Sequence, residues 1–320
     1  MKRLYRFFSF SILIIFLILL PQLSTKDYYI HMLVMAGIYS ILAQSLGLII
    51  GFTGQVSLCH AAFYGIGAYI SALLALNFGL SFWITFWFGG IGAGVVAYLF
   101  GCLVLRLKGH FLAITTALFG IMVTLILDNW TELTKGPMGL PGIPNPSPVQ
   151  LLGVKLQFVS RTEYYYLILV FVLLTALIIY RIIHSRIGRA MIAIRENEEV
   201  AQSVGINTMR FKLAAFSIGS GFAGIAGSFY AHYILFISPI SFTLPESINI
   251  LVMMIFGGMQ TLLGPIVGAV TLTFLPEFLR MTGALRLTLY GLALMLLIIF
   301  LPSGIVGGIK EKWVSFREKS

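Results

Sequence analysis

Two glycine-rich stretches interrupt the apolar parts of this sequence and carry polar side chains that could contact a solute. The first comprises Gly51, Thr53, Gly54, Gln55, Ser57 and His60, and the second comprises Gly257, Gly258, Gln260 and Thr261. Glycine lets a helix unwind, and backbone groups freed inside a membrane are tolerated only where protein buries them or where they line a watery cavity. Both stretches combine glycine, glutamine and a hydroxyl residue, which suggests a weak internal repeat. We therefore predict that these residues flank a substrate pathway.

Some residues of these stretches have a second interpretation. Gly65, Gly67, Gly264 and Gly268 could simply let neighbouring helices approach closely, as small residues do in membranes. A single histidine such as His60 is typical of a hydrogen-bonded packing residue, with a gate or ligand role as the alternative. The other histidines are too scattered along the chain for a metal site: His31, His110, His184 and His232.

Residues 181–212 form a charged island between two apolar segments, in a chain with only 10% charged residues. Such a density of charge cannot lie in hydrocarbon, so the island must be a water-exposed loop, and its Glu, Arg and Ala content favours short helices. We interpret it as a surface for a soluble partner, the alternative being a solvated loop without one. The residues predicted to make the coupling contact are Arg195, Glu196, Glu198, Glu199, Ala201, Gly205 and Asn207.

The sequence contains no recognisable catalytic motif. It has no HExxH, CxxC or nucleophile-elbow motif, and it has no GxxxxGK[ST] phosphate loop, so any ATP would have to be bound by a partner. We expect no catalytic residue, no metal ligand and no cofactor on this chain. Cys59 and Cys102 lie in or beside apolar segments, which is typical of inert packing residues rather than of a disulfide or metal pair.

The elements that position these residues must be membrane-spanning helices. Mean hydropathy is +0.98, and no Asp, Glu, Lys or Arg occurs between residues 28 and 105. One crossing needs roughly 20 apolar residues, so that run alone holds about three. We predict an all-α, polytopic transmembrane bundle with spans at 7–23, 28–50, 61–80, 82–105, 111–127, 164–183, 211–237, 248–278 and 287–301.

The stretch 248–278 crosses either once or twice, because Gly257, Gly258, Gly264 and Pro265 interrupt it. With two crossings the chain has about 10 spans and both termini in the cytoplasm, and 15 of the 21 Lys and Arg residues face that side, as the positive-inside rule requires. This basic face matches anionic lipid; nothing in it indicates nucleic acid. The long loop 128–163 is then outside, as a connector or a docking surface, and the island loop 184–211 is cytoplasmic.

No Asp, Glu, Lys or Arg lies deep inside a predicted span, and Asp128, Glu246, Glu277 and Arg280 fall near span ends. Ion-coupled carriers bury titrating groups, so this pattern disfavours a secondary carrier, which remains an alternative. It suits a neutral, zwitterionic or apolar solute that is moved by energy supplied elsewhere.

Four separated motifs support a resemblance to a known family. Residues 199–205, Glu-Val-Ala-Gln-Ser-Val-Gly, match the EAAxxxG pattern of ABC importer permeases with Val200 in place of one Ala, and the stretches 54–69, 111–120, 136–144 and 188–205 agree in order. From about residue 37 to 301 the chain resembles the LivM-type permeases of branched-chain amino-acid ABC importers. It departs from them at Cys59, where glycine is common, and at Val200.

The resemblance implies a function and a set of partners. It implies a permease domain over 28–301, preceded by a basic end and first span (1–27) and followed by a cytoplasmic tail (302–320). The expected partners are a LivH-type permease, one or two ATPase subunits that bind ATP and Mg²⁺, and an extracytoplasmic binding protein, all at the inner membrane of a bacterium. Urea- or amide-type importers have similar permeases, so the substrate stays open.

Overall fold

The structure is a computed structural model that describes residues 20–21, 27–151, 154–156, 158–279, 285, 288, 291–292, 295 and 304–308. The predicted spans 7–23 and 287–301, the basic N-terminal end and the tail 302–320 lie almost wholly outside these residues. The predictions about them are therefore untested by the structure.

The described part of the chain is a bundle of helices, as predicted. Six helices are long and apolar enough to cross a membrane: α2 (Asp27–Thr53), α3 (His60–Phe78), α4 (Phe82–Val104), α5 (Gly109–Asn129), α7 (Arg161–Ile183) and α10 (Thr208–Ile234). Two shorter apolar helices follow, α11 (Leu244–Gly257) and α12 (Gly264–Phe278). This confirms a polytopic, all-helical membrane architecture.

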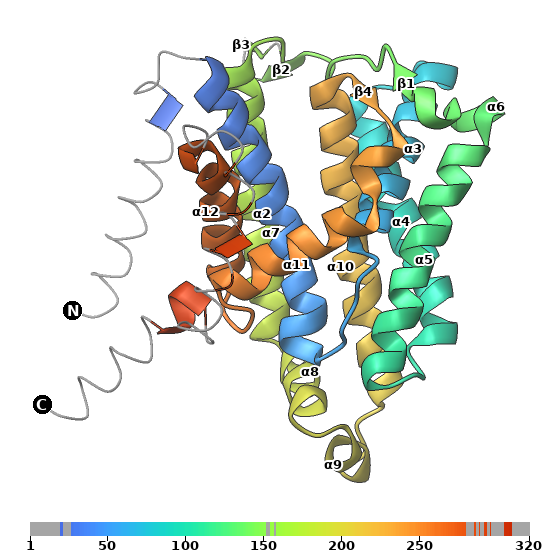
Figure 1. The fold of residues 1–320 in the computed structure, drawn as a ribbon, viewed down its shortest axis with the longest axis vertical. Coiled ribbons are helices and arrows are strands. Elements are labelled where there is room, and N and C mark those ends of the chain that lie inside the picture. Colours follow the sequence, from blue (N-terminus) through green and yellow to red (C-terminus); the bar gives the residue numbers. More distant parts are fainter. Residues whose placement is uncertain are drawn as a thin grey trace, which may run out of the picture.

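Short irregular elements close one end of the bundle. They are α6 (Thr131–Thr134), the 3₁₀ turns η1 (Gly136–Met138) and η2 (Pro239–Phe242), and the strands β1 (Leu140–Pro141), β2 (Val149–Leu151), β3 (Val154–Leu156) and β4 (Phe236–Ile237). β1 pairs with β4 and β2 with β3, both antiparallel. We call this the β-strand end, and we call the opposite end, which carries α8 (Arg186–Glu196) and α9 (Glu198–Ser203), the α8–α9 end (Figure 1).

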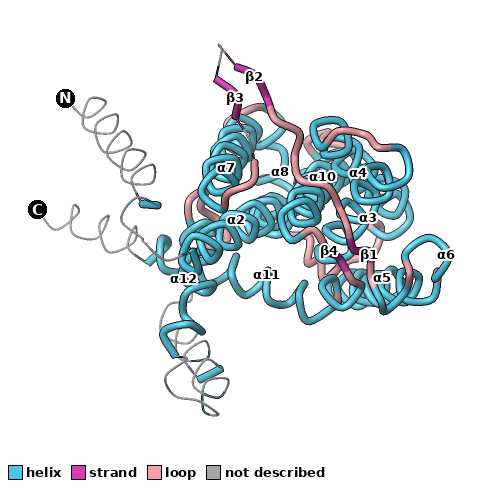
Figure 2. Tube along the Cα trace, turned by 90° about the horizontal axis from the view of Figure 1, so that it is seen from above, coloured by secondary structure: helices cyan, strands magenta, loops and turns pink. Residues whose placement is uncertain are grey.

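Helix α10 is the centre of the bundle and packs against α2, α3 and α4. Small residues allow this, because a Cβ atom at Gly67 would overlap the backbone of Gly224, and the Ser228 hydroxyl donates to the Gly67 carbonyl oxygen over 3.2 Å. The close-packing interpretation of Gly67 therefore agrees with the structure. Seen from above, α11 lies along one edge of the bundle, between α12 and α5 (Figure 2).

Two helices of the bundle begin at half its height. α2 runs to the α8–α9 end, and segment 54–59, the first break, then turns back into the bundle, where α3 starts (Figure 1). α10 runs the opposite way, and segment 235–243, the second break, turns back to the start of α11. The two helix starts meet, since the Ala61 amide donates to the Ser247 hydroxyl over 2.9 Å.

A further chain reversal lies outside the two predicted glycine stretches, at 235–243, and the helix that follows it meets the start of α3. The second break contains no glycine, because a 3₁₀ turn that begins at Pro239 and a proline in the first turn of α11 redirect the chain instead. The predicted interruption at Gly257 and Gly264 is confirmed, because α11 ends at Gly257 and α12 begins at Gly264.

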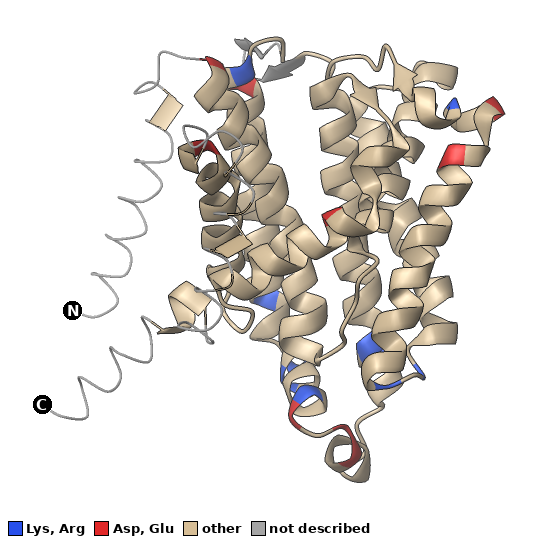
Figure 3. Cartoon of the chain, viewed as in Figure 1, with Lys and Arg blue, Asp and Glu red and all other residues tan. Residues whose placement is uncertain are grey.

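Charged residues are distributed unevenly along the length of the bundle. Lys and Arg of the described residues gather mainly at the α8–α9 end, while the middle is nearly free of them (Figure 3). Helices α8 and α9 confirm that the charged island forms short helices, and side chains cap each of them: Ser185 accepts from the Ile187 and Gly188 amides, and Asn197 accepts from the Glu199 and Val200 amides.

Candidate functional site

The predicted pathway residues of the first stretch lie at two levels of the bundle. Gly51 and Thr53 belong to the last turn of α2, and Gly54 and Gln55 follow at the α8–α9 end. Ser57 and His60 lie further into the bundle, where the Ser57 hydroxyl is 3.3 Å from Cys59 Sγ and His60 Nε2 is 2.8 Å from Ser45 Oγ. Most of the first stretch therefore lies at one end, and only its last residues reach the middle.

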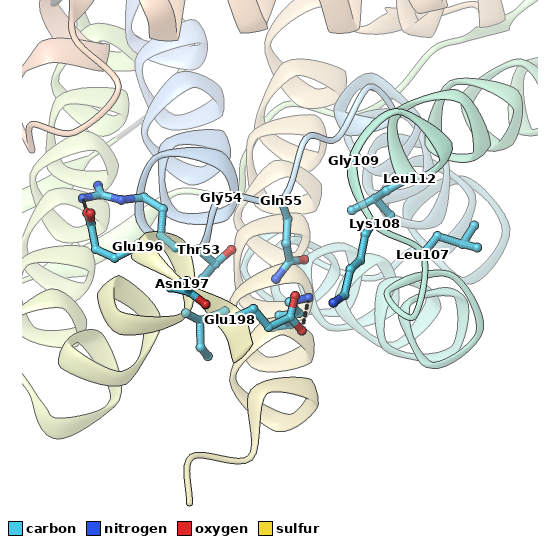
Figure 4. A pocket seen from close by; sticks show the side chains of 13 residues that line it. Thr53, Gly54, Gln55, Leu107, Lys108, Gly109, Leu112, Glu196, Asn197 and Glu198 are labelled. Carbon is cyan, nitrogen blue, oxygen red and sulfur yellow. Dashed lines mark hydrogen bonds and ion pairs between the residues drawn. The ribbon is translucent and has the colours of Figure 1, made fainter. Parts of the chain in front are cut away.

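Gln55 faces a pocket of about 250 Å³ at the α8–α9 end. Its side chain is 3% exposed, and neither of its amide atoms has a hydrogen-bond partner among the described residues. The side chains of Gln55, Lys108 and Glu198 point toward one another across this pocket (Figure 4). The pocket is lined by Thr53, Gly54, Gln55, Leu107, Lys108, Gly109, Leu112, Ile194, Arg195, Glu196, Asn197, Glu198 and Lys212.

Arg195 connects the two predicted sets of residues. Its guanidinium Nη1 donates to the Gly51 carbonyl oxygen over 2.8 Å, and Nη2 pairs with the Glu196 carboxylate. The arginine side chain also packs against Gly54. Residues that the sequence suggested for ATPase coupling and for the pathway therefore contact each other directly, which sequence spacing did not indicate.

A second contact holds α9 to α10. Lys212 Nζ lies 2.6 Å from Glu198 Oε1, with side-chain exposures of only 9% and 21%. The Thr208 hydroxyl donates to the same carboxylate over 3.2 Å, and the Gln202 amide donates to Thr208 over 2.9 Å. Burial alone would raise the pKa of Glu198, but the hydrogen bond and charge of Lys212, with contributions from Thr208 and Lys108, lower it below the ordinary glutamate value.

Most of the remaining predicted coupling residues are buried in the loop or cap and end its helices. Ala201 is buried, Asn207 caps α10 by accepting from the Arg210 amide over 3.1 Å, and Gly205 follows α9. Glu199 is exposed, with its carboxylate 3.7 Å from Lys108 Nζ. The exposed part of α9 is therefore acidic and accessible to a partner, while its inner side is fastened to α10.

The second predicted stretch lies at the α8–α9 end as well. Gly257 and Gly258 are buried, Gln260 is exposed, and the Thr261 hydroxyl donates to the Gly258 carbonyl oxygen over 2.9 Å. A Cβ atom at Gly51 would overlap the Met259 carbonyl oxygen, so the two glycine stretches pack against each other there.

The acidic residue Glu246 was not among the predicted site residues. The structure places it in the first turn of α11, within hydrogen-bonding reach of Tyr39, which lies at the middle of α2, and of Asn249. The sequence placed Glu246 near the end of a predicted span, and the structure places it in the first turn of α11. The predicted span began at 248, so it did not show that the Leu-Pro-Glu-Ser sequence before it starts a helix inside the bundle.

A favourable interaction with the N-terminus of α11 does not by itself explain why an acidic residue occupies position 246. A helix N-terminus stabilises a nearby carboxylate by about 0.3–1 kcal/mol at exposed sites, whereas a charge at the centre of a membrane costs about 2.5–3.5 kcal/mol on insertion scales. Glu246 is a half-buried residue, and none of the ion pairs among the described residues includes it. A cation beside it would favour the charged form of its carboxyl group.

No group of three or more metal-ligating side chains occurs among the residues that the structure describes. Cys59 and Cys102 are free thiols, the first buried and the second half-buried.

Comparison with known proteins identifies the family. Residues 28–301 match the family model described as "Branched-chain amino acid transport system / permease component". The chain is 35% identical over 287 residues to the high-affinity branched-chain amino acid transport system permease protein LivM of Escherichia coli strain K12, covering 84% of this chain and 68% of LivM.

Two further relatives show the breadth of the similarity. The permease protein LivH of the same transport system and strain is 26% identical over 288 residues, covering 84% of this chain and 91% of LivH. The fructose import permease protein FrcC of Rhizobium meliloti is 25% identical over 251 residues, covering 73% of this chain and 69% of FrcC. No solved structure matches the chain significantly. This chain belongs to the family of permease components of branched-chain amino acid transport systems, and it is a transport protein rather than an enzyme.

Proposed function

We propose that this chain is the transmembrane permease subunit of an ATP-driven importer for branched-chain or other hydrophobic amino acids. It binds no cofactor itself, and ATP and Mg²⁺ are bound by one or two separate ATPase subunits. A LivH-type permease and an extracytoplasmic binding protein complete the complex in the inner membrane of a bacterium. The similarity to LivM supports the substrate class, and the similarity to LivH supports a pair of related permeases.

The contact between Arg195 and Gly51 carries the mechanistic part of the proposal. Force applied to α8 and α9 by an ATPase reaches the end of α2 through this hydrogen bond and reaches α10 through the ion pair of Glu198 with Lys212. Both long helices lead directly into the breaks that turn back toward the middle of the bundle. A movement at the α8–α9 end can thus change the position of the helix starts at Ala61 and Ser247.

Two substitutions on the exposed part of the island test the coupling. Glu199→Lys reverses an exposed charge, and Gly205→Leu places a side chain at a residue with φ +85°, which L residues rarely adopt. We expect each to lower ATP-dependent uptake of leucine at least about fivefold while the amount of permease in the membrane stays unchanged. Glu132→Lys, an exposed charge reversal at the β-strand end, is the matched control.

Full uptake by both island variants would contradict the coupling role. Uptake that persists in vesicles with a proton gradient and without ATP would instead support an ion-coupled carrier. Purification in mild detergent followed by mass spectrometry checks the proposed partners independently.

The topology of about ten spans with cytoplasmic termini is part of the same proposal. Gln202 and Thr131 lie in exposed positions at opposite ends of the bundle. In a background without other cysteines, Gln202→Cys should react with a membrane-impermeant thiol reagent only in inside-out vesicles, and Thr131→Cys only in right-side-out ones. The reverse pattern would invalidate the orientation and the coupling proposal with it.

A further inference from the structure

We propose that Glu246 and the aromatic side chains around it bind the ammonium group of the transported solute at the middle of the pathway. This inference rests on the proposed function, because it assigns a site to the amino-acid class of substrate. It concerns a residue that is neither in the glycine stretches nor in the α8–α9 loop.

The position of Glu246 in the bundle suits a cationic ligand, because no ion pair among the described residues includes its carboxyl group. Its carboxyl group lies beside Tyr39 at the middle of α2, and the neighbouring Ser247 accepts the Ala61 amide where the two helix starts meet. The ion pairs of the described residues use Glu196, Glu198 and Glu199, all at the α8–α9 end. Acidic residues at this depth in membrane proteins mark substrate or ion pathways.

The hydrogen bonds available to Glu246 leave room for a ligand. A carboxylate has about four acceptor positions, and the side chains within reach, Tyr39 and Asn249, can supply a donor each. Glu246, Tyr39 and Asn249 are each half-buried rather than fully enclosed. A primary ammonium group, with three donors, can use the remaining positions through charge-assisted hydrogen bonds.

Aromatic rings within electrostatic range of the carboxylate provide a second feature that favours an ammonium group. Tyr64 and Tyr230 lie within that range of Glu246, and their ring centroids are 5.5 Å apart. Phe242 lies 5.0 Å from Tyr64 and 6.1 Å from Tyr230. The faces of such rings attract cations electrostatically, which complements an acidic group beside them.

The site draws on four helices and both breaks. Tyr39 comes from α2, Tyr64 from α3, Tyr230 from α10 and Glu246 from α11, while Phe242 ends the 3₁₀ turn of the second break. A movement of either helix start would therefore change the distance between the carboxylate and the rings. That property suits a site that must bind a solute and then release it.

The test uses the complete transporter, with its partner permease, ATPase subunits and binding protein, reconstituted in liposomes. Leucine is the probe, and leucine uptake, basal ATP hydrolysis and copurification of the subunits are measured for each variant. Glu246→Gln removes the charge but keeps the size and hydrogen bonding of the side chain. Glu277→Gln is the matched control, because Glu277 lies in the neighbouring α12 and accepts from the Tyr28 hydroxyl instead.

We expect Glu246→Gln to lower the maximal rate of leucine uptake at least about tenfold while subunit assembly and basal ATP hydrolysis stay unchanged. Glu277→Gln should stay within about twofold of the wild type, as surface substitutions usually do. Glu246→Asp, which keeps the charge, should recover part of the uptake. Tyr230→Phe, which keeps the aromatic face, should transport better than Tyr230→Leu.

Each contrary result has a defined meaning. Wild-type uptake by Glu246→Gln would overturn the site, and so would loss of subunit assembly or an equal loss of uptake in Glu246→Asp, because both indicate a structural role. Equal uptake by Tyr230→Phe and Tyr230→Leu would remove the aromatic part of the site. If the wild-type complex takes up no amino acid, the proposed function fails instead, and the two failures are thereby distinguishable.

Discussion

The backbone amide of Ala61 donates a hydrogen bond to the hydroxyl of Ser247 over 2.9 Å, although 186 residues separate them along the chain. Ala61 lies in the first turn of α3 and Ser247 in the first turn of α11, so this bond joins the two helices that begin inside the bundle. Amides in the first turn of a helix have no partner within that helix. The serine therefore satisfies a backbone group that has little access to water.

Ser247→Ala should destabilise the bundle. It leaves the Ala61 amide without its acceptor, which costs about 1–3 kcal/mol for a buried group, and we expect a lower thermal midpoint of the purified protein. Ser220→Ala is the control, because the Ser220 hydroxyl is equally buried but has no hydrogen-bond partner among the described residues. An equal effect of both substitutions would show that the bond to Ala61 contributes nothing.

Arg195→Ala should weaken the coupling of ATP hydrolysis to uptake. The substitution removes the hydrogen bond to the Gly51 carbonyl oxygen, so we expect at least about fivefold less leucine taken up per ATP hydrolysed. Arg189→Ala, at an exposed position of the same helix, should leave this ratio unchanged. Unaltered coupling in Arg195→Ala would mean that force reaches α2 by another route.

The contact of Glu198 with Lys212 should persist under mildly acidic conditions. Since folding lowers the pKa of Glu198, its stabilisation is fully present above the unfolded-state pKa and is lost as pH falls through the lower folded-state pKa. Hydrogen exchange of α9 amides should therefore stay slow from neutral pH to below the usual glutamate range. Glu198→Gln should lower the local opening free energy by about 1.5–3 kcal/mol and make it independent of pH in this range.

Gly51→Ala should be poorly tolerated. A Cβ atom there meets the Met259 carbonyl oxygen, which is backbone and cannot rotate away, so overpacking of about 1–3 kcal/mol or more is expected as a lower thermal midpoint. At Gly120 the nearest atom to an added Cβ is 3.6 Å away, an ordinary contact. Gly120→Ala should therefore be neutral, and comparable loss in both variants would contradict the packing of the two glycine stretches.

Local sequence properties predicted much of the fold correctly. The long apolar runs predicted α2, α3, α4, α5, α7 and α10 because crossing a bilayer requires continuous apolar length, which hydropathy reports directly. The charged island predicted α8 and α9 outside the apolar layer for the complementary reason. Gly257 and Gly264 also indicated where α11 ends and α12 begins.

The pairing of distant segments was decided only by the tertiary structure. Glycine marks where a chain can bend, but it does not specify which segments meet, so the glycine pattern did not indicate that the helix starts after 54–59 and after 235–243 contact each other. The contact of Arg195 with Gly51 likewise depends on where α8 folds against α2.

The sequence by itself determined that this is a helical membrane protein with a charged loop between its spans, because composition and periodicity are properties of each segment alone. Only the tertiary structure decided that Glu246 lies within hydrogen-bonding reach of Tyr39, at the middle of α2. The depth of a side chain depends on where its helix begins relative to its neighbours, and packing between segments far apart in the chain sets that position.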